Sequence, residues 1–211
     1  MISFRDLRTP EDISRWISRL NSKWPERAEV MAHICDQLRR LLVATPHIIE
    51  LGFGSGLLAK YLLTELPHLT YTGLDSSELL LTYAQEILAP YGDRVRLLQA
   101  DLNSDSWPNL LSEEIHAIIS LQSLHDLGGE AQLNRIYATA KTLLVPGGLF
   151  LNADLVVPSH QENPKNPGRR SIPRHLELLE SHGYERISCT LAVGEFGCVV
   201  AFVPSSPLPK G

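Results

Sequence analysis

Apolar residues along this chain follow two patterns: short continuous runs, and longer stretches in which apolar positions recur every three or four residues. The short runs have the length of buried strands and occupy residues 47–51, 69–75, 94–102, 115–121 and 149–156. Stretches with helical periodicity lie at residues 57–66, 77–88, 130–144 and 174–182. Strands that alternate with helices in this way predict a parallel sheet with helices on both faces.

Two more strands are predicted near the C-terminal end of the sequence. Residues 186–193 and 197–203 alternate apolar and polar positions around the turn sequence G-E-F-G at 194–197, which is typical of an antiparallel hairpin. The expected fold is therefore α/β: a doubly wound, seven-stranded sheet that is mostly parallel and has a C-terminal antiparallel hairpin.

The region before the first strand is predicted to be helical in two pieces. Apolar residues first recur at helical spacing over 13–20, and the pattern is interrupted at 21–25. A second helix is predicted over 25–42, with Pro25 suited to its first turn. Its expected inward face consists of Ala28, Met31, Ile34, Cys35, Leu38 and Leu42. The chain is thus divided into an N-terminal helical region (1–45), a core (46–204) and a tail (205–211) that we expect to be disordered.

A glycine-rich turn follows the first predicted strand. Residues 50–56 read E-L-G-F-G-S-G, and glycine lets the backbone take positive φ and lets a ligand approach main-chain N–H groups. Only one residue separates the last two glycines, whereas the dinucleotide-binding fingerprint has two. The spacing therefore favours a nucleoside ligand without a pyrophosphate.

Acidic residues end the next two predicted strands. Asp75 comes 19 positions after Gly56, where a carboxylate can accept hydrogen bonds from both ribose hydroxyls. Asp101 ends the third strand, where it is placed to accept a hydrogen bond from the exocyclic amine of a base. The turn and the two acids, taken together in this order and at this spacing, indicate a nucleoside-binding site more specifically than any one of them alone.

Together these segments resemble the first three motifs of the class I S-adenosylmethionine-dependent methyltransferases. The segments 117–125 (A-I-I-S-L-Q-S-L-H) and 144–151 (L-V-P-G-G-L-F-L) are similar to the fourth strand of that family and the turn into its fifth, so the resemblance extends over residues 46–203. It implies a Rossmann-like sheet, S-adenosylmethionine as cofactor, and a lid role for residues 1–45, although these helices could simply pack on the sheet. The cofactor-binding residues that it implies are Glu50, Gly52, Phe53, Gly54, Gly56, Asp75, Ser76, Asp101, Leu102, Leu121 and Gln122.

The candidate catalytic residue is His125, just past the fourth strand, because an imidazole can take a proton near neutral pH. The alternative is a histidine that only forms hydrogen bonds in the pocket or caps a helix. A basic, proline-rich loop over 157–173 leaves the fifth strand where a substrate would enter, but its arginines could equally be solvated. The candidate substrate-contacting residues are Trp16, Trp24, Arg27, His125, Asp154, His160, Arg169 and Arg170.

Composition narrows the function further. The 211 residues suit a single domain, 44% are hydrophobic, and no apolar stretch approaches the roughly 20 residues of a membrane span. The first residues are unlike a secretory signal, so we expect a cytoplasmic protein. The net charge of −5 argues against nucleic acid as a substrate. Three widely spaced cysteines indicate reduced thiols.

We expect no metal, because Leu121 and Gln122 occupy the position of the strand-end acids that hold magnesium in catechol-type O-methyltransferases. The prediction is a metal-independent methyltransferase that acts on nitrogen, oxygen or carbon of a small molecule, as a monomer or homodimer. The alternative is a non-catalytic, methyltransferase-like protein that binds the cofactor or supports a partner. An NAD-dependent oxidoreductase is disfavoured by the glycine spacing, and an aminopropyl transferase by the basic loop.

Overall fold

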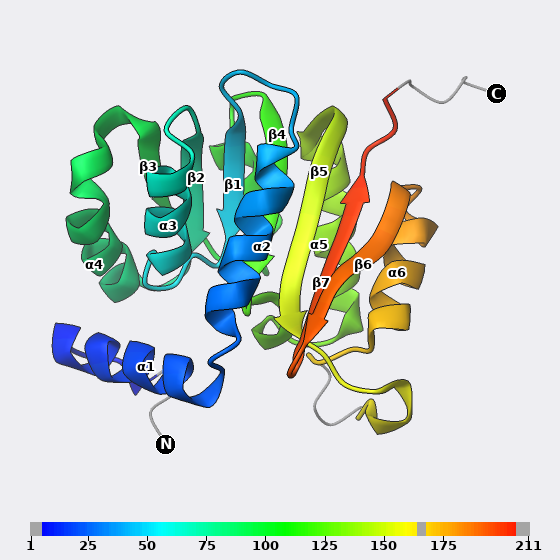
Figure 1. The fold of residues 1–211 in the computed structure, drawn as a ribbon, viewed down its shortest axis with the longest axis horizontal. Coiled ribbons are helices and arrows are strands. Elements are labelled where there is room, and N and C mark those ends of the chain that lie inside the picture. The colour runs from blue at the N-terminus through cyan, green and yellow to red at the C-terminus, as the bar shows by residue number, and fades with distance from the viewer. Residues whose placement is uncertain (1–5, 164–167, 206–211) are drawn as a thin grey trace.

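The computed structural model describes residues 6–163 and 168–205, which form a seven-stranded sheet in the order β3-β2-β1-β4-β5-β7-β6 (Figure 1). Neighbouring strands from β3 to β5 are parallel, while β7 runs antiparallel to both β5 and β6. The predicted doubly wound α/β fold with its C-terminal hairpin is confirmed. The strands are β1 His47–Leu51, β2 Thr70–Asp75, β3 Val95–Gln99, β4 Ile115–Leu121, β5 Leu144–Leu155, β6 Glu185–Val193 and β7 Phe196–Phe202.

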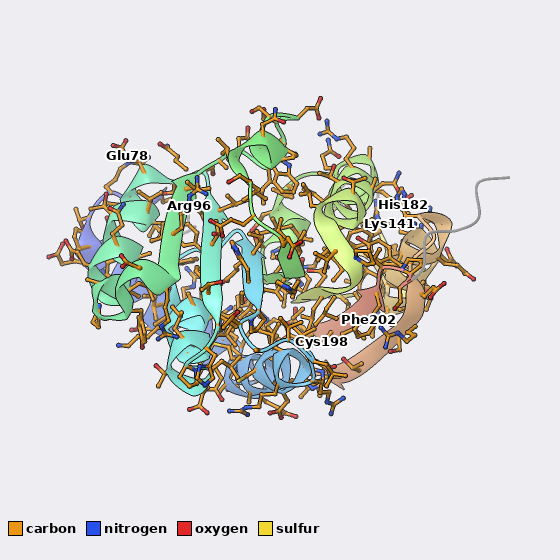
Figure 2. All side chains as sticks on the ribbon, turned by 90° about the horizontal axis from the view of Figure 1, so that it is seen from above. Glu78, Arg96, Lys141, His182, Cys198 and Phe202 are labelled. Atoms are coloured by element: carbon orange, nitrogen blue, oxygen red, sulfur yellow. The ribbon has the colours of Figure 1, made fainter. Side chains whose placement is uncertain are left out.

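Helices cover both faces of the sheet, as Figure 2 shows from above. The α-helices are α1 Pro10–Lys23, α2 Arg27–Arg39, α3 Leu57–Glu65, α4 Glu78–Leu88, α5 Glu130–Leu143 and α6 Ile172–Ser181. Apolar residues of α2, α3 and α4 pack on one face, and those of α5 and α6 on the other. Successive residues of β1 alternate between these two cores, Ile48 in the first and Ile49 in the second. A strand buried on both faces explains the continuous apolar run in the sequence.

The N-terminal helices differ in detail from the prediction. The predicted interruption is confirmed but starts later, since α1 continues to Lys23 and the break covers Trp24–Glu26. Helix α2 ends at Arg39 instead of residue 42. The chain then turns toward β1, so Leu42 is fully exposed where an inward position was predicted. Ala28 is also exposed, and Val30 takes the buried position in its turn of the helix. These two assignments were wrong because the predicted helix was longer than the observed one: Leu42 lies beyond its end, and Ala28 lies in its exposed first turn.

The fifth strand also starts earlier than predicted. β5 begins at Leu144, which pairs with Ile115, and a register shift separates this pair from the main ladder. The glycines that suggested a turn before the strand lie inside it, and Gly147 and Gly148 exchange backbone hydrogen bonds with Val203. A positive φ at Gly147 lets the strand bend there without ending.

Helix α1 lies across the carboxyl ends of the parallel strands (Figure 1). Thr9 and Asp12 form a capping box at its start, with the Thr9 Oγ1 accepting from the Asp12 N–H at 3.2 Å. Ile13 packs with Leu80 of α4 in a small separate core, so α1 rests on α4 and not on the sheet. This places its Trp16 over the glycine-rich turn, 3.5 Å from the position that a Cβ at Gly54 would occupy.

Candidate functional site

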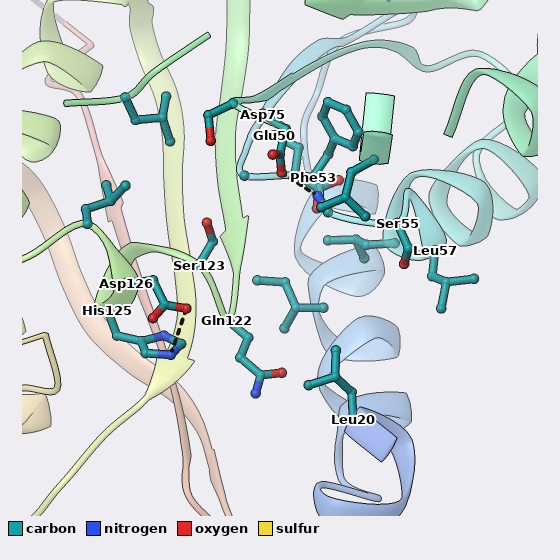
Figure 3. Close-up of a pocket in the computed structure, with 18 of the residues that line it drawn as sticks. Leu20, Glu50, Phe53, Ser55, Leu57, Asp75, Gln122, Ser123, His125 and Asp126 are labelled. Carbon is teal, nitrogen blue, oxygen red and sulfur yellow. Dashed lines mark hydrogen bonds and ion pairs between the residues drawn. The ribbon is translucent and has the colours of Figure 1, made fainter. Parts of the chain in front are cut away.

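A pocket of about 350 Å³ opens at the carboxyl ends of the strands, where ligands of doubly wound sheets bind (Figure 3). Its wall is built from the ends of β1, β2 and β4, the segments that follow them and β3, and the helices α1 and α2. Asp75 and Glu50 lie at one end of the pocket in Figure 3, and His125 and Asp126 at the other. Residues from the whole first two thirds of the sequence therefore converge on one cavity.

The glycine-rich turn forms the floor of this pocket. Gly52 has a φ of +72°, and a Cβ there would lie 1.8 Å from the Ser123 Oγ, so only glycine fits between the turn and the segment after β4. The Gly54 N–H donates to the Asp75 Oδ2 at 2.9 Å, which ties the turn to the end of β2. Gly56 is not among the pocket-lining residues: its φ is +73° and its α-carbon faces Ala84 of α4.

Glu50 is a buried carboxyl group at the end of β1, with 2% of its surface exposed. Burial raises its pKa to about 8, although the Tyr71 hydroxyl donates to Glu50 Oε2 at 2.7 Å and Arg27 lies near enough to favour the charged form. No ion pair to the Glu50 carboxylate is found among the described residues. A cation that entered the pocket would therefore stabilise the ionised form of Glu50.

The two strand-end aspartates differ in exposure. Asp75 accepts from the Gly54 N–H and, through Oδ1, from the Ser77 N–H at 3.0 Å; burial raises its pKa, and these backbone bonds oppose the rise. Asp101 is exposed and accepts from the Asn103 N–H at 2.9 Å. Both carboxylates line the pocket and keep lone pairs that can accept further hydrogen bonds.

His125 and Asp154 form a close pair at the other end of the pocket. The His125 Nδ1 lies 2.6 Å from the Asp154 Oδ1, and the His125 backbone N–H donates to Oδ2 at 2.9 Å. Since a carboxylate only accepts, Nδ1 carries the proton and Nε2 is left for the pocket, 3.5 Å from Asp126 Oδ2. Burial alone would lower the pKa of His125, but the charge and hydrogen bond of Asp154 outweigh burial and raise it.

The Asp154 carboxylate is stabilised by hydrogen bonds from its neighbours. Burial would raise its pKa, but His125 and the Leu155 N–H stabilise the carboxylate more strongly, so its pKa lies below the ordinary value. Next to it on the same face of β5, the Asn152 amide donates to the Tyr137 hydroxyl at 3.3 Å, and that hydroxyl lies 2.7 Å from His175 Nδ1. His175 is buried in this network between α5 and α6.

The arginines of the loop after β5 have carboxylate partners. Arg169 pairs with Glu195 at 2.8 Å. Arg170 Nε lies 3.3 Å from Glu130 without the angle of a hydrogen bond, and Glu162 is 4.0 Å from its Nη1. Residues 164–167 of the predicted loop lie outside the described residues, as does nearly all of the predicted tail.

Most of the predicted site residues line the pocket. These are Trp16, Trp24, Arg27, Glu50, Gly52, Phe53, Gly54, Asp75, Ser76, Asp101, Leu102, Leu121, Gln122 and His125. The lining does not include Gly56, Asp154, His160, Arg169 and Arg170. Lining residues that the sequence analysis did not name include Leu20, Asn103, Ser123, Asp126 and Leu127. Apart from Leu20, these directly flank predicted residues, so extending each strand-end motif by one or two positions would have found them.

The residues fit S-adenosylmethionine. A glycine floor, an acid at the end of β2 and an acid beyond β3 present acceptors to a nucleoside. The buried Glu50 lies at the same end as Asp75, and the His125 pair lies at the other end. Among residues 6–163 and 168–205 there is no cluster of three or more histidine, cysteine, aspartate or glutamate residues that could hold a metal ion. Over the same residues no helix is both long and apolar enough to cross a membrane.

Comparison with known proteins agrees with this geometry. Residues 49–150 match the family model described as "Methyltransferase domain". The trans-aconitate 2-methyltransferase of Acidovorax sp. (strain JS42) is 33% identical over 121 residues, 56% of this chain and 43% of that protein. The enzyme of the same name from Paracidovorax citrulli is 27% identical over 143 residues, 67% of this chain and 50% of that protein. The chain thus spans half or less of the length of these relatives.

Solved structures share the fold. The S-adenosylmethionine-dependent methyltransferase SibL matches with a TM-score of 0.72 at 20% identity, over 93% of this chain and 60% of that chain. Human N-acetylserotonin methyltransferase in complex with its cofactor matches with a TM-score of 0.68 at 17% identity, over 93% of this chain and 57% of that chain. The predicted resemblance is confirmed: residues 49–150 match a methyltransferase domain, and the chain shares the fold of S-adenosylmethionine-dependent methyltransferases.

Proposed function

We propose that this protein transfers the methyl group of S-adenosylmethionine to a small molecule without a metal ion. The observation that carries the proposal is that one pocket joins the glycine-rich turn and the strand-end acids to the His125–Asp154 pair. When bound, the cofactor supplies an electrophilic methyl group on a positively charged sulfur. The bond from sulfur to methyl breaks as a bond from the acceptor to methyl forms, which leaves S-adenosylhomocysteine.

The protein's part in this reaction is to position the two reactants and, where the acceptor is an O–H or N–H group, to remove its proton. Asp75 would accept hydrogen bonds from the ribose hydroxyls, and Asp101 with the Leu102 N–H would bind the adenine. His125 Nε2 would take the proton of an acceptor O–H or N–H, while Asp154 keeps the ring oriented and stabilises the positive charge that develops on it. Helix α1 and Trp16 would act as the lid.

The acceptor is proposed to be a small molecule that reaches the pocket between α1 and the segment after β4. The names of the curated relatives suggest trans-aconitate as the first acceptor to test. The paired arginines of the loop after β5 are less suited to hold it than Arg27, which lines the pocket. A cytoplasmic location and a monomeric or homodimeric state complete the proposal.

We expect wild-type protein to bind S-adenosylhomocysteine at one site, and at a hundredfold excess over Kd this should raise the free energy of unfolding by about 2.7 kcal/mol. Isothermal titration and thermal unfolding measure binding, and release of S-adenosylhomocysteine from the methyl donor measures turnover with trans-aconitate, hydroxy acids, phenols and amines. No binding of either cofactor form at millimolar concentration would refute the proposal. Binding without turnover on any acceptor would favour the non-catalytic alternative.

A further inference from the structure

The segment that leads into α6 lies directly against the backbone of His125. Its contact residue is Gly168, where a Cβ would lie 1.6 Å from the His125 carbonyl oxygen and 2.6 Å from the carbonyl carbon. A Cβ keeps at least 3.0 Å from such atoms, so only glycine fits here unless one of the two backbones moves. The Cα hydrogen that a side chain would replace therefore points at the carbonyl oxygen, as in a weak C–H···O contact.

His125 belongs to a very short element, the single 3-10 turn Leu124–Asp126 after β4. Asp154 holds the backbone N–H of His125 at 2.9 Å and its ring Nδ1 at 2.6 Å. The carbonyl of the same residue meets Gly168 instead. A turn of three residues has few hydrogen bonds of its own, so its neighbours decide where the imidazole lies.

Backbone hydrogen bonds anchor the segment 168–171 beside this turn. The Arg170 carbonyl accepts from the Val157 N–H, which follows β5, at 3.2 Å. The Ser171 N–H donates to the Glu162 Oε1 at 2.8 Å. Ser171 is also buried and caps the start of α6 with its side chain. The end of the segment is therefore fixed to β5 and α6.

Two ion pairs hold the same region to neighbouring elements. Arg169 donates to Glu195, in the turn between β6 and β7, at 2.8 Å. Arg174, in the first turn of α6, pairs with Glu130 at the start of α5 at 2.6 Å. A segment held at this many points cannot easily retreat. We therefore expect that an atom added at Gly168 moves the short turn opposite it.

We propose that Gly168 is a positioning residue for His125. Its missing side chain lets the segment 168–171 close on the His125 carbonyl, and this contact, together with the Asp154 hydrogen bonds, fixes how far the imidazole reaches into the pocket. The inference rests on the proposed function, in which Nε2 of this ring takes the proton of the acceptor. Displacing a catalytic group by about 1 Å can lower a rate about 100-fold, so the contact bears directly on turnover.

The test enlarges this residue in two steps. With the fastest O–H or N–H acceptor of the panel above, Gly168→Ala should lower kcat about 10- to 100-fold, and Gly168→Val should lower it further. The KM of the acceptor and the affinity for S-adenosylhomocysteine should stay within threefold of wild type. A parallel loss of that affinity would contradict the inference, because the whole pocket would then be disturbed. The matched control is Gly92→Ala: a φ of +55° strains alanine there, but no atom lies within 4 Å, so stability should fall while kcat stays unchanged.

An NMR titration of the His125 ring separates positioning from a merely structural role. The charged groups that act on the ring are Asp154, Asp126 and Arg169, and Gly168→Ala changes none of them. A displaced ring lies farther from Asp154, so its pKa should fall below the wild-type value. An unchanged pKa in a folded Gly168→Ala variant, or a kcat equal to that of the control, would show the inference wrong while the proposed function stands.

Glu162→Ala covers the case in which Gly168→Ala does not fold. It removes the carboxylate that accepts from the Ser171 N–H and adds no atom beside His125. The loosened segment should lower kcat about 3- to 10-fold and lower the pKa of the ring. Glu162→Gln keeps an oxygen acceptor and controls for the lost charge. Values for Glu162→Ala equal to those of wild type would refute the inference. If wild type binds no S-adenosylhomocysteine or methylates no acceptor, the proposed function fails, and the inference fails with it.

Discussion

Asp75→Ala should lower the affinity for S-adenosylhomocysteine by about 100- to 10,000-fold. A hydrogen bond to a charged group contributes about 1.5–3 kcal/mol, and the Asp75 carboxylate is proposed to accept two from the ribose. The carboxylate also holds the Gly54 and Ser77 N–H groups, so its loss releases the glycine-rich turn as well. Calorimetry at constant pH measures the affinity, and thermal unfolding without ligand shows whether the variant is folded.

The control for this prediction is Glu78→Gln, which removes an exposed carboxylate three residues away on the first turn of α4. It should leave the affinity unchanged. Asp75→Asn keeps one carbonyl acceptor, so its affinity for S-adenosylhomocysteine should lie between those of Asp75→Ala and wild type. With a 2′,3′-dideoxyadenosine ligand the difference between wild type and Asp75→Asn should shrink. Equal binding of S-adenosylhomocysteine by wild type and Asp75→Ala would contradict the ribose assignment.

The sheet could be predicted from the sequence because each strand carries its own signal. β1 is buried on both faces, so all five of its residues are buried, and its apolar residues Ile48, Ile49 and Leu51 show no alternation before the turn. The ends of helices were less accurate, because they depend on contacts with distant residues. Leu42 is exposed because the chain leaves the helix before it to enter β1. No neighbouring residue in the sequence indicates that the helix ends there.

The end of the pocket that holds Asp75 and Asp101 could be predicted for a similar reason. Its acids directly follow strands, and in a parallel sheet the carboxyl ends of strands meet at one edge. The pairing of His125 with Asp154 at the other end could not, since the two residues are 29 positions apart and become partners only because β4 and β5 are neighbours. The sequence gives no sign either that Arg169 would meet Glu195 or that the Trp24 indole would stay unpaired.

His125→Gln should lower the rate of methyl transfer to a hydroxyl or amine acceptor by about 100- to 10,000-fold, the usual contribution of a general base. The affinity for S-adenosylhomocysteine should stay within threefold of wild type, because the ring lies at the acceptor end of the pocket. Since a base acts in its neutral form, the rate in wild type should rise with pH through the raised pKa of His125. A carboxylate acceptor has no proton to lose at neutral pH, and its methylation should depend far less on His125.

Asp154→Asn separates this role from a merely structural one, without requiring the acceptor. The amide can still accept from the His125 backbone N–H, but it carries no charge, so burial should bring the pKa of His125 below its wild-type value. In wild type the protonated ring stabilises the native state fully below the unfolded pKa of about 6.5, and this stability is lost as pH rises through the raised pKa.

In the Asp154→Asn variant the stability of the native state should not fall with rising pH in this way. Urea unfolding at a series of pH values measures this stability, and NMR titration of the His125 ring measures its pKa. The matched control is Asp126→Asn, whose carboxylate lies 3.5 Å from Nε2 and is 41% exposed. It should lower the His125 pKa less than Asp154→Asn does, since solvent screens an exposed charge. An equal effect of the two variants would mean that Asp154 does not control the charge of the ring, and the assignment of His125 as an oriented base would fail.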